Sequence, residues 1–252
     1  MAERFDPAHT LTLLWGTHNR SGRSGLSLKT IVQAALSLAD TEGLSSLSMR
    51  KVAEQLQVGT MSLYTHVPSK TVLIELMVDT VYAGLYSSPE EATQQPGGWR
   101  AGLTFIAFQN WELFKQHPWM LDLSGQRPVL GPHATLKYET ELRPLDGIGL
   151  TDLEMDTSLQ LLLTHTEGSA RLSLRQTRAI QDSGLTDLEW WTMQAPLLER
   201  VMDSRRFPVA SRVGQAAGEI HNAPFNPEHH LQFGLERILD GIESLLAERK
   251  TT

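Results

Sequence analysis

The chain has 252 residues, 40% of them apolar and 20% charged, so a globular protein with a sizeable core is expected. It contains no cysteine, which excludes a disulfide framework, a thiolate metal site and a cysteine nucleophile. Since no apolar run approaches the ~20 residues of a membrane span, we expect a cytoplasmic protein with no membrane partner.

The net charge of −7 is distributed unevenly along the chain. Residues 20–70 hold six basic and three acidic side chains, whereas residues 71–252 hold 15 basic and 24 acidic ones. This asymmetry favours a segment that binds a polyanion, carried on a body whose excess acidic charge keeps it in solution.

Residues 1–27 are predicted to form a flexible N-terminal arm. They show little apolar periodicity, and glycine and serine surround two arginines, Arg20 and Arg23. The arginines give this segment positive charge without a core around which it could fold.

Two helices are predicted after the arm. The first begins after Ser27, a suitable N-cap, because apolar residues then recur at the i, i+3, i+4, i+7 spacing of an amphipathic helix. Gly43 suits the left-handed position that ends it. The second is short, covers Met49 to Leu56, and can be capped by Ser46 or Ser48.

A third short helix is predicted after a brief turn in which Gly59 relaxes the backbone. It begins at Thr60 or Ser62 and runs through His66, and Pro68 stops it before a fourth, longer helix. A short helix, a tight turn and a second short helix form the layout of a helix-turn-helix, whose second helix fits the ~12 Å wide major groove of DNA.

The rest of the chain is predicted to be helical, with proline and glycine between the segments and no alternation long enough for a strand. The predicted helices cover residues 99–116, 131–146, 152–180, 186–204, 208–220 and 227–248. We therefore predict an all-α fold in two parts, a three-helix DNA-binding head at 28–70 and a larger helical domain at 71–252.

The run from Leu47 to Lys70, in which Tyr64, His66 and Val67 lead into the fourth helix, resembles the tetracycline-repressor (TetR) family. The resemblance is specific over residues 28–80 and weaker over the rest. It implies a helix-turn-helix head, a C-terminal domain that binds a small molecule, and a homodimer formed through a four-helix bundle. The motif Gly-Thr-Met-Ser-Leu-Tyr at residues 59–64 also resembles that of an actinobacterial branch of the family whose members carry N-terminal basic arms.

The resemblance implies which residues contact DNA. Arg50 matches an arginine that reads a guanine in the tetracycline repressor, a bidentate contact of about 1–3 kcal/mol. The base-contacting start of the recognition helix matches Thr60, Met61 and Ser62. Phosphate contacts are expected from Ser48, Tyr64, Thr65, His66 and Lys70.

Plainer interpretations stay open for several of these residues. Tyr64 has the spacing of a core aromatic. The alternative for Arg50 is a solvated charge on a helix face, although the surrounding motif favours a DNA contact. Arg20 and Arg23 are hypothesised to enter the adjacent minor groove, although most basic tails are simply solvated.

Effector-binding residues are expected in two segments of the larger domain. Residues 99–123 combine aromatic and polar side chains, a composition typical of ligand pockets and also of plain cores. The candidates are Phe108, Trp111, Phe114 and His117 from this segment, Arg127 just after it, and Gln160, Thr164 and His165 from the long helix.

A metal-dependent effector is not expected. The tetracycline branch of the family binds a magnesium chelate through a histidine just before Leu-Gly-Thr-Arg-Pro, and Leu123 occupies that position here, before Ser-Gly-Gln-Arg-Pro. The histidines His221, His229 and His230 lack a helical metal-ligand spacing and are predicted to lie at the surface. We therefore expect a metal-free organic effector and no cofactor.

The predicted function is a DNA-binding transcriptional repressor released from a palindromic operator by a small organic ligand. The apolar stripes of 186–204 and 227–248 are candidates for the homodimer interface. No catalytic motif is present, so an enzyme is not expected. The alternatives are an activator or ligand-independent regulator, a helical small-molecule-binding protein without DNA function, and a helical enzyme with an unrecognised site.

Overall fold

The computed structural model describes residues 7–16, 26–123, 125, 127–223 and 225–250. These residues form helices and no strand, which confirms the predicted all-α fold class. None of the described helices combines the length and the apolar character needed to cross a membrane. The chain packs as two compact units, residues 1–160 with 246–252 and residues 161–245, which are described separately below.

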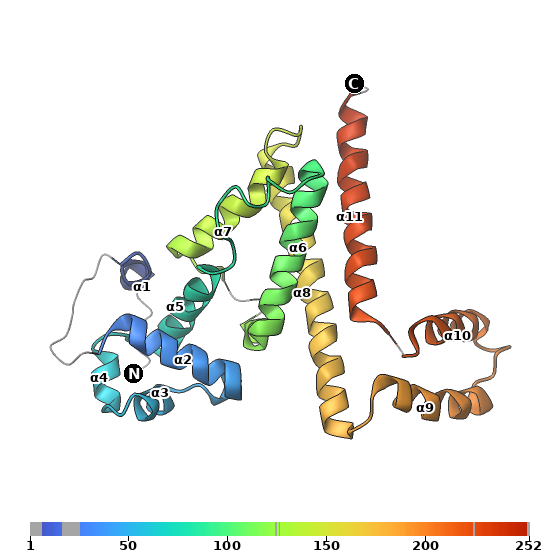
Figure 1. Cartoon of the computed structure of the whole chain (residues 1–252), viewed down its shortest axis with the longest axis horizontal. Coiled ribbons are helices and arrows are strands. Elements are labelled where there is room, and N and C mark those ends of the chain that lie inside the picture. The colour runs from blue at the N-terminus through green and yellow to red at the C-terminus, as the bar shows by residue number, and fades with distance from the viewer. Residues whose placement is uncertain (1–6, 17–25, 124, 126, 224, 251–252) are drawn as a thin grey trace. The chain divides into compact units, whose positions relative to one another are not determined.

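The N-terminal half of the first unit holds the predicted head (Figure 1). The helices of this half are α1 (Pro7–Leu14), α2 (Leu28–Glu42), α3 (Met49–Gln55), α4 (Thr60–Tyr64) and α5 (Lys70–Tyr82), with a 3₁₀ turn η1 (Leu44–Ser46). Helices α2, α3 and α4 form the predicted head. Ser27 caps α2 by accepting a hydrogen bond from the Thr30 amide, and Gly43 ends it at φ 80°, as predicted.

The rest of the first unit consists of α6 (Gly98–Gln116), the 3₁₀ turns η2 (Pro118–Leu123) and η3 (Arg143–Leu145), α7 (Pro132–Leu142), the start of α8 (Asp152–Ser183) and the end of α11 (Pro227–Lys250). The helix predicted at 131–146 therefore ends early. Pro144 has no amide hydrogen to donate, so the last turn tightens into η3.

One hydrophobic core runs through the head and beyond it. It contains Leu63 and Val67 near α4, much of α5, and Trp119 and Met120 of η2. The packing is thus continuous across residue 70, so the division into a head at 28–70 and a domain at 71–252 remains a functional prediction.

The segment expected to be a flexible arm differs in part from that expectation. Residues Pro7–Leu14 form α1, and Leu13 and Leu14 belong to the same core as α5. The indole of Trp15 donates a hydrogen bond to the Leu130 carbonyl at 3.0 Å. A short apolar run with little periodicity thus orders against a surface built by later residues, and Arg20 and Arg23 lie outside the described residues.

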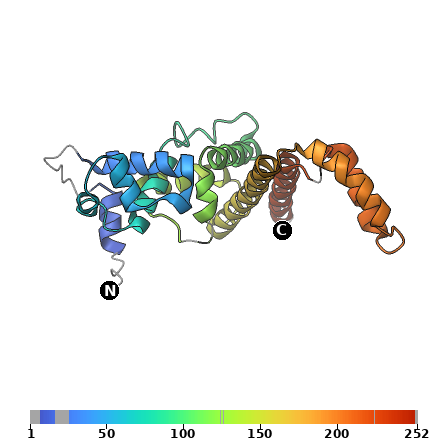
Figure 2. The same cartoon turned by 90° about the horizontal axis from the view of Figure 1, so that it is seen from below.

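The second unit holds the rest of α8, α9 (Asp187–Val201), α10 (Pro208–His221) and most of α11. Helices α9 and α10 form a hairpin, drawn in orange in both views (Figures 1 and 2). Thr186 and Glu189 start α9 with a capping box, in which the side chain of each residue accepts a hydrogen bond from the backbone amide of the other. The hydrogen bonds from the amide and hydroxyl of Thr186 lower the pKa of Glu189.

Candidate nucleic-acid interface and effector domain

Side-chain caps fix the start of the helices in the head. Ser48, rather than Ser46, caps α3 by accepting from the Lys51 amide, and Ser69 caps α5 by accepting from the Val72 amide. Ala53 of α3 is 1% exposed, so this small residue lies inside the packing between α3 and its neighbours. These caps fix the first turns of α3 and α5, which precede and follow α4.

The turn between α3 and α4 is built differently from the prediction. Gly59 has φ −69° and serves as the N-cap of α4 in extended conformation, which any residue can adopt. The left-handed residue is Gln57, at φ 56°. The expectation that Gly59 relaxes the turn is therefore wrong, because the positive φ falls two residues earlier.

Helix α4 exposes the side chains predicted to touch DNA. Met61 is 76% exposed and Tyr64 is 43% exposed, whereas Leu63 between them is fully buried and anchors the helix. Tyr64 is thus a surface residue and not a core aromatic. Ser62 and Thr65 are also exposed, and the Thr65 hydroxyl donates to the Ser62 carbonyl at 2.7 Å.

Arg50 projects from the start of α3 and is exposed. Its Nε donates to Glu54 one turn later at 2.7 Å, and the hydrogen bond and charge of Glu54 raise the pKa of Arg50. This ion pair uses Nε, so both Nη atoms, which make a bidentate contact to guanine, have no hydrogen bond to any described residue. Glu54 therefore orients the guanidinium and leaves its two Nη atoms available for such a contact.

The remaining predicted phosphate contacts lie beside α4. Ser48, His66 and Lys70 are half-buried, and Lys70 donates from Nζ to the Leu44 carbonyl at 3.4 Å. Thr60, the predicted base contact at the start of α4, is also half-buried. Lys70 is also the first residue of α5, where the helix dipole favours an anion.

The predicted effector residues of α6 do not share one environment. Trp111 is buried, Phe108 is half-buried, and Phe114 is packed against the core of the head. The side chain of His117 instead pairs with Asp40 of α2, at 2.7 Å from Nδ1 to Oδ1. The indole of Trp119 donates to the same oxygen at 2.7 Å. The segment that follows α6 is therefore hydrogen-bonded to α2 at Asp40.

Thr164 and His165 both line a cavity of about 680 Å³ within the second unit. His165 lies so close to α11 that a Cβ on Gly234 would be 2.2 Å from its ring, and its Nε2 is 3.0 Å from the Leu231 carbonyl. Because a carbonyl only accepts, this nitrogen carries the proton. Arg127 and Gln160, the other candidates, are exposed residues of the first unit.

The three C-terminal histidines line the same cavity, a grouping that the sequence did not reveal. His221 and His229 have ring centroids 5.0 Å apart, and His230 also contributes to the wall. Within the described part of the chain no group of three histidine, cysteine or acidic residues could hold a metal ion.

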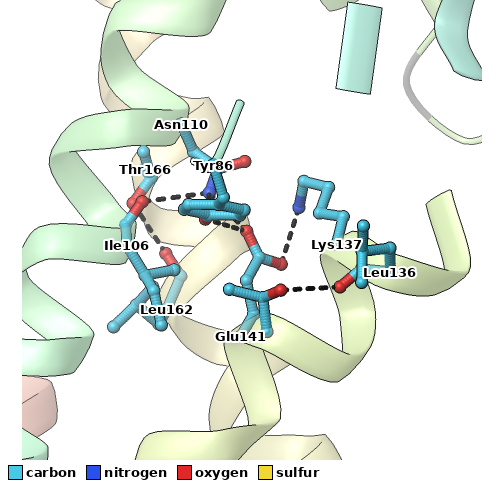
Figure 3. A network of polar contacts seen from close by, with 9 residues as sticks. Tyr86, Ile106, Asn110, Leu136, Lys137, Glu141, Leu162 and Thr166 are labelled. Carbon is cyan, nitrogen blue, oxygen red and sulfur yellow. Dashed lines mark hydrogen bonds and ion pairs between the residues drawn. The ribbon is translucent and has the colours of Figure 1, made fainter. Parts of the chain in front are cut away.

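A buried polar network joins α6 and α7 to the chain that follows α5 (Figure 3). The carboxylate of Glu141, 1% exposed, accepts from the Tyr86 hydroxyl at 2.6 Å, Asn110 at 2.7 Å and Lys137 at 2.7 Å. Burial, and then the charge of Glu141, raises the pKa of Tyr86, so this hydroxyl remains a donor. Hydrogen bonds to both carboxylate oxygens offset part of the cost of burying the charge of Glu141.

A second link attaches α7 to the middle of α5. The buried Asp79 accepts from the backbone amides of His133 and Ala134, at 3.0 and 2.9 Å, and from His133 Nδ1 at 2.8 Å. Its carboxylate therefore caps the N-terminus of α7. Lys137 of α7 also places its ammonium group 5.3 Å from the centre of the Tyr82 ring. Helix α5 therefore contacts α7 at both Asp79 and Tyr82.

A capped head that presents one short exposed helix, joined to a larger helical region, defines a helix-turn-helix transcriptional regulator. Family models agree with this class: "Bacterial regulatory proteins, tetR family" matches residues 31–77, and "Tetracyclin repressor-like, C-terminal domain" matches residues 91–246. The chain therefore belongs to the TetR family, which confirms the resemblance noted in the sequence.

Individual relatives are similar over most of their length. The HTH-type transcriptional repressor DrrR1 of Streptomyces coeruleorubidus is 42% identical over 97% of this chain and 88% of its own. The tetracycline repressor protein class E of Escherichia coli is 26% identical over 90% and 95%. The crystal structure of Streptomyces coelicolor ActR with actinorhodin has a TM-score of 0.72 at 25% identity, covering 88% of this chain and 97% of that one.

Proposed function

We propose that this chain is a homodimeric repressor that holds a palindromic operator through α4 and releases it when a small organic effector binds. The observation that carries the proposal is the surface of α4, where the buried Leu63 anchors a helix whose Met61, Ser62, Tyr64 and Thr65 face outward. The repressor relative and the family models favour this function over a helical ligand-binding protein without DNA function.

In this proposal the head divides its contacts between bases and phosphates. Arg50 reads a guanine, and Thr60, Met61 and Ser62 approach base edges, with Met61 offering an apolar surface to a thymine methyl. Phosphates are contacted by Ser48, Tyr64, Thr65, His66 and Lys70. Arg20 and Arg23 add contacts in the neighbouring minor groove.

The effector is proposed to be a metal-free organic molecule. Leu123 stands where a ligating histidine is required for a magnesium chelate, and ActR structures with actinorhodin and with (S)-DNPA show organic molecules bound to a relative of the same fold. The cavity at Thr164 and His165 supports binding in this region, since its volume of about 680 Å³ lies in the range of small-molecule sites. Phe108, Trp111, Phe114, His117, Arg127 and Gln160 remain proposed contributors.

Release requires that the effector favours a conformation in which the two heads no longer match the operator. Helix α5 is the natural transmitter, because it starts in the head at Lys70 and is fastened to α7 through Asp79. A displacement of α7 is therefore expected to move α5 and the head with it.

The test is binding of the full chain to the DNA upstream of its own gene, across a salt series, for wild type and Arg50→Ala. We expect specific binding that weakens steeply as salt rises, and a loss of about tenfold or more for the variant. Arg205→Ala is the matched control, because Arg205 is also exposed and paired with a nearby carboxylate, at 3.4 Å from Asp203, but lies outside the head.

Wild-type binding no tighter than to random DNA, here and in a genome-wide selection for binding sites, would overturn the proposal. Equal losses for Arg50→Ala and Arg205→Ala would remove the proposed base contact, because they would indicate only a general effect of positive charge.

A further inference from the structure

The hairpin of α9 and α10, drawn in orange in Figures 1 and 2, forms a groove with a volume of about 650 Å³, called the α9–α10 groove below. One face of α9 lines it with Trp191, Ala195, Leu198 and Met202, and α10 contributes mostly small residues such as Gly214. None of its lining residues belongs to the cavity at Thr164 and His165. It is therefore a separate space, whose volume suits a small molecule.

Trp191 forms the aromatic wall of this groove, and Gly218 fixes its position. A Cβ on Gly218 would lie 2.4 Å from the indole ring, closer than any real contact, so only glycine lets the ring lie against α10. An indole held in this way offers a flat apolar surface to a planar ligand.

The groove also contains a buried polar atom. The hydroxyl oxygen of Ser211 is buried and has no hydrogen-bond partner among the described residues. A buried polar atom left unpaired costs free energy, which a ligand with hydrogen-bond donors would recover.

The charged residues that line the groove are both acidic. Glu219 accepts from the Gln215 amide at 2.9 Å, and Glu199 makes no ion pair with a described residue. No lysine, arginine or histidine contributes to the lining. Together with the Trp191 face, which attracts cations, this charge pattern selects a positively charged aromatic ligand and disfavours an anionic one.

The groove is distinct from the surface that a second copy of the chain is expected to cover. The outer face of α9 carries an exposed apolar stripe at helical spacing, formed by Trp190, Met193, Leu197 and Val201. None of these four residues lines the groove. A dimer contact through the outer stripe would therefore leave the groove accessible.

From these observations we infer that the α9–α10 groove is a binding site for a lipophilic aromatic cation. Its planar part stacks on Trp191, its positive charge lies near Glu199 and Glu219, and a hydrogen-bond donor reaches Ser211. This site does not depend on operator binding, and it is additional to the proposed effector site.

The test uses two xanthene dyes of opposite charge, rhodamine 6G as the cation and fluorescein as the anion, titrated with the full chain and followed by fluorescence anisotropy. We expect one rhodamine 6G per chain, bound about tenfold or more tighter than fluorescein. Trp191→Ala and the double variant Glu199→Gln, Glu219→Gln should each weaken rhodamine 6G about tenfold. Trp99→Ala is the control, since Trp99 is a half-buried tryptophan of α6 that does not line the groove, and this variant should bind as wild type does.

Ser211→Ala distinguishes a ligand contact from a packing role. It should weaken the binding of rhodamine 6G several-fold. In the absence of dye the variant should be as stable as wild type or more stable, because the substitution removes an unpaired buried hydroxyl. Circular dichroism checks that each variant is folded.

Equal affinity for the two dyes, or equal losses for Trp99→Ala and Trp191→Ala, would overturn the inference. So would rhodamine 6G affinity that falls as the chain concentration rises, because a second copy would then be the occupant of the groove.

Discussion

Gln57 carries the main backbone strain in the head. Its φ of 56° lies in the left-handed region, which is unfavourable for a residue with a Cβ by about 1–2 kcal/mol. The backbone amides of Gln57 and Val58 are both hydrogen-bonded, the first to the Glu54 carbonyl and the second to the Ala53 carbonyl. The turn thus keeps its hydrogen bonds at the cost of one strained residue.

Gln57→Gly should therefore raise the free energy of unfolding by about 0.5–1 kcal/mol, measured by urea denaturation. The gain is smaller than the strain because glycine also increases the freedom of the unfolded chain. Gly43→Ala is the reciprocal control, because Gly43 has φ 80°, and it should lower stability by about 1 kcal/mol or more. Changes of the same sign in both variants would contradict this account of the turn.

At the scale of the elements, α7 is attached to α5 by Asp79 and to α6 by the network around Glu141. Gly131 belongs to the first of these links, since a Cβ there would lie 2.1 Å from the Asp79 carboxylate. This carboxylate cannot turn aside without losing its three hydrogen bonds to α7. The glycine is thus required by a contact, not by its own backbone angle.

A double-mutant cycle tests this link. Gly131→Ala and Asp79→Ala should each lower the free energy of unfolding by about 2–3 kcal/mol, the first through overlap and the second through the lost cap. The double variant should be more stable than the sum of the two effects by about 1 kcal/mol or more, because removing the carboxylate removes the overlap. Additive effects would show that Gly131 and Asp79 act separately.

At the scale of the whole molecule, the proposed operator binding requires two heads, and so a dimer. Helix α9 has no buried residue in the isolated chain, and its outer stripe leaves Met193 57% and Leu197 52% exposed. Contiguous apolar surface of this kind is typical of an interface.

Leu197→Asp should therefore shift the chain towards monomer in sedimentation analysis and weaken operator binding in parallel. Leu153→Asp, which changes an equally apolar residue that is 75% exposed at the start of α8, is the control and should stay dimeric. A dimer that is unaffected by Leu197→Asp would assign the interface to other surfaces, such as α11.

Most of the helices, and the head that they form, could be predicted from the sequence. The periodic apolar stripes, the cap at Ser27 and the stop at Pro68 are local signals, and the observed helices follow them closely. The site was less predictable. Arg50 and the α4 residues have the expected exposure, whereas His117, expected near an effector, is paired with Asp40.

The sequence by itself determined the fold class, the helix-turn-helix and the family, because helix periodicity, caps and short motifs depend on residues a few positions apart. Only the tertiary structure decided which distant residues meet: Asp79 with the start of α7, Glu141 with Tyr86, and Trp191 with Gly218. These pairs lie 27 to 55 positions apart, so no local propensity specifies them. They arise because packing brings a buried charge to its donors and a large ring to the one residue that leaves it room.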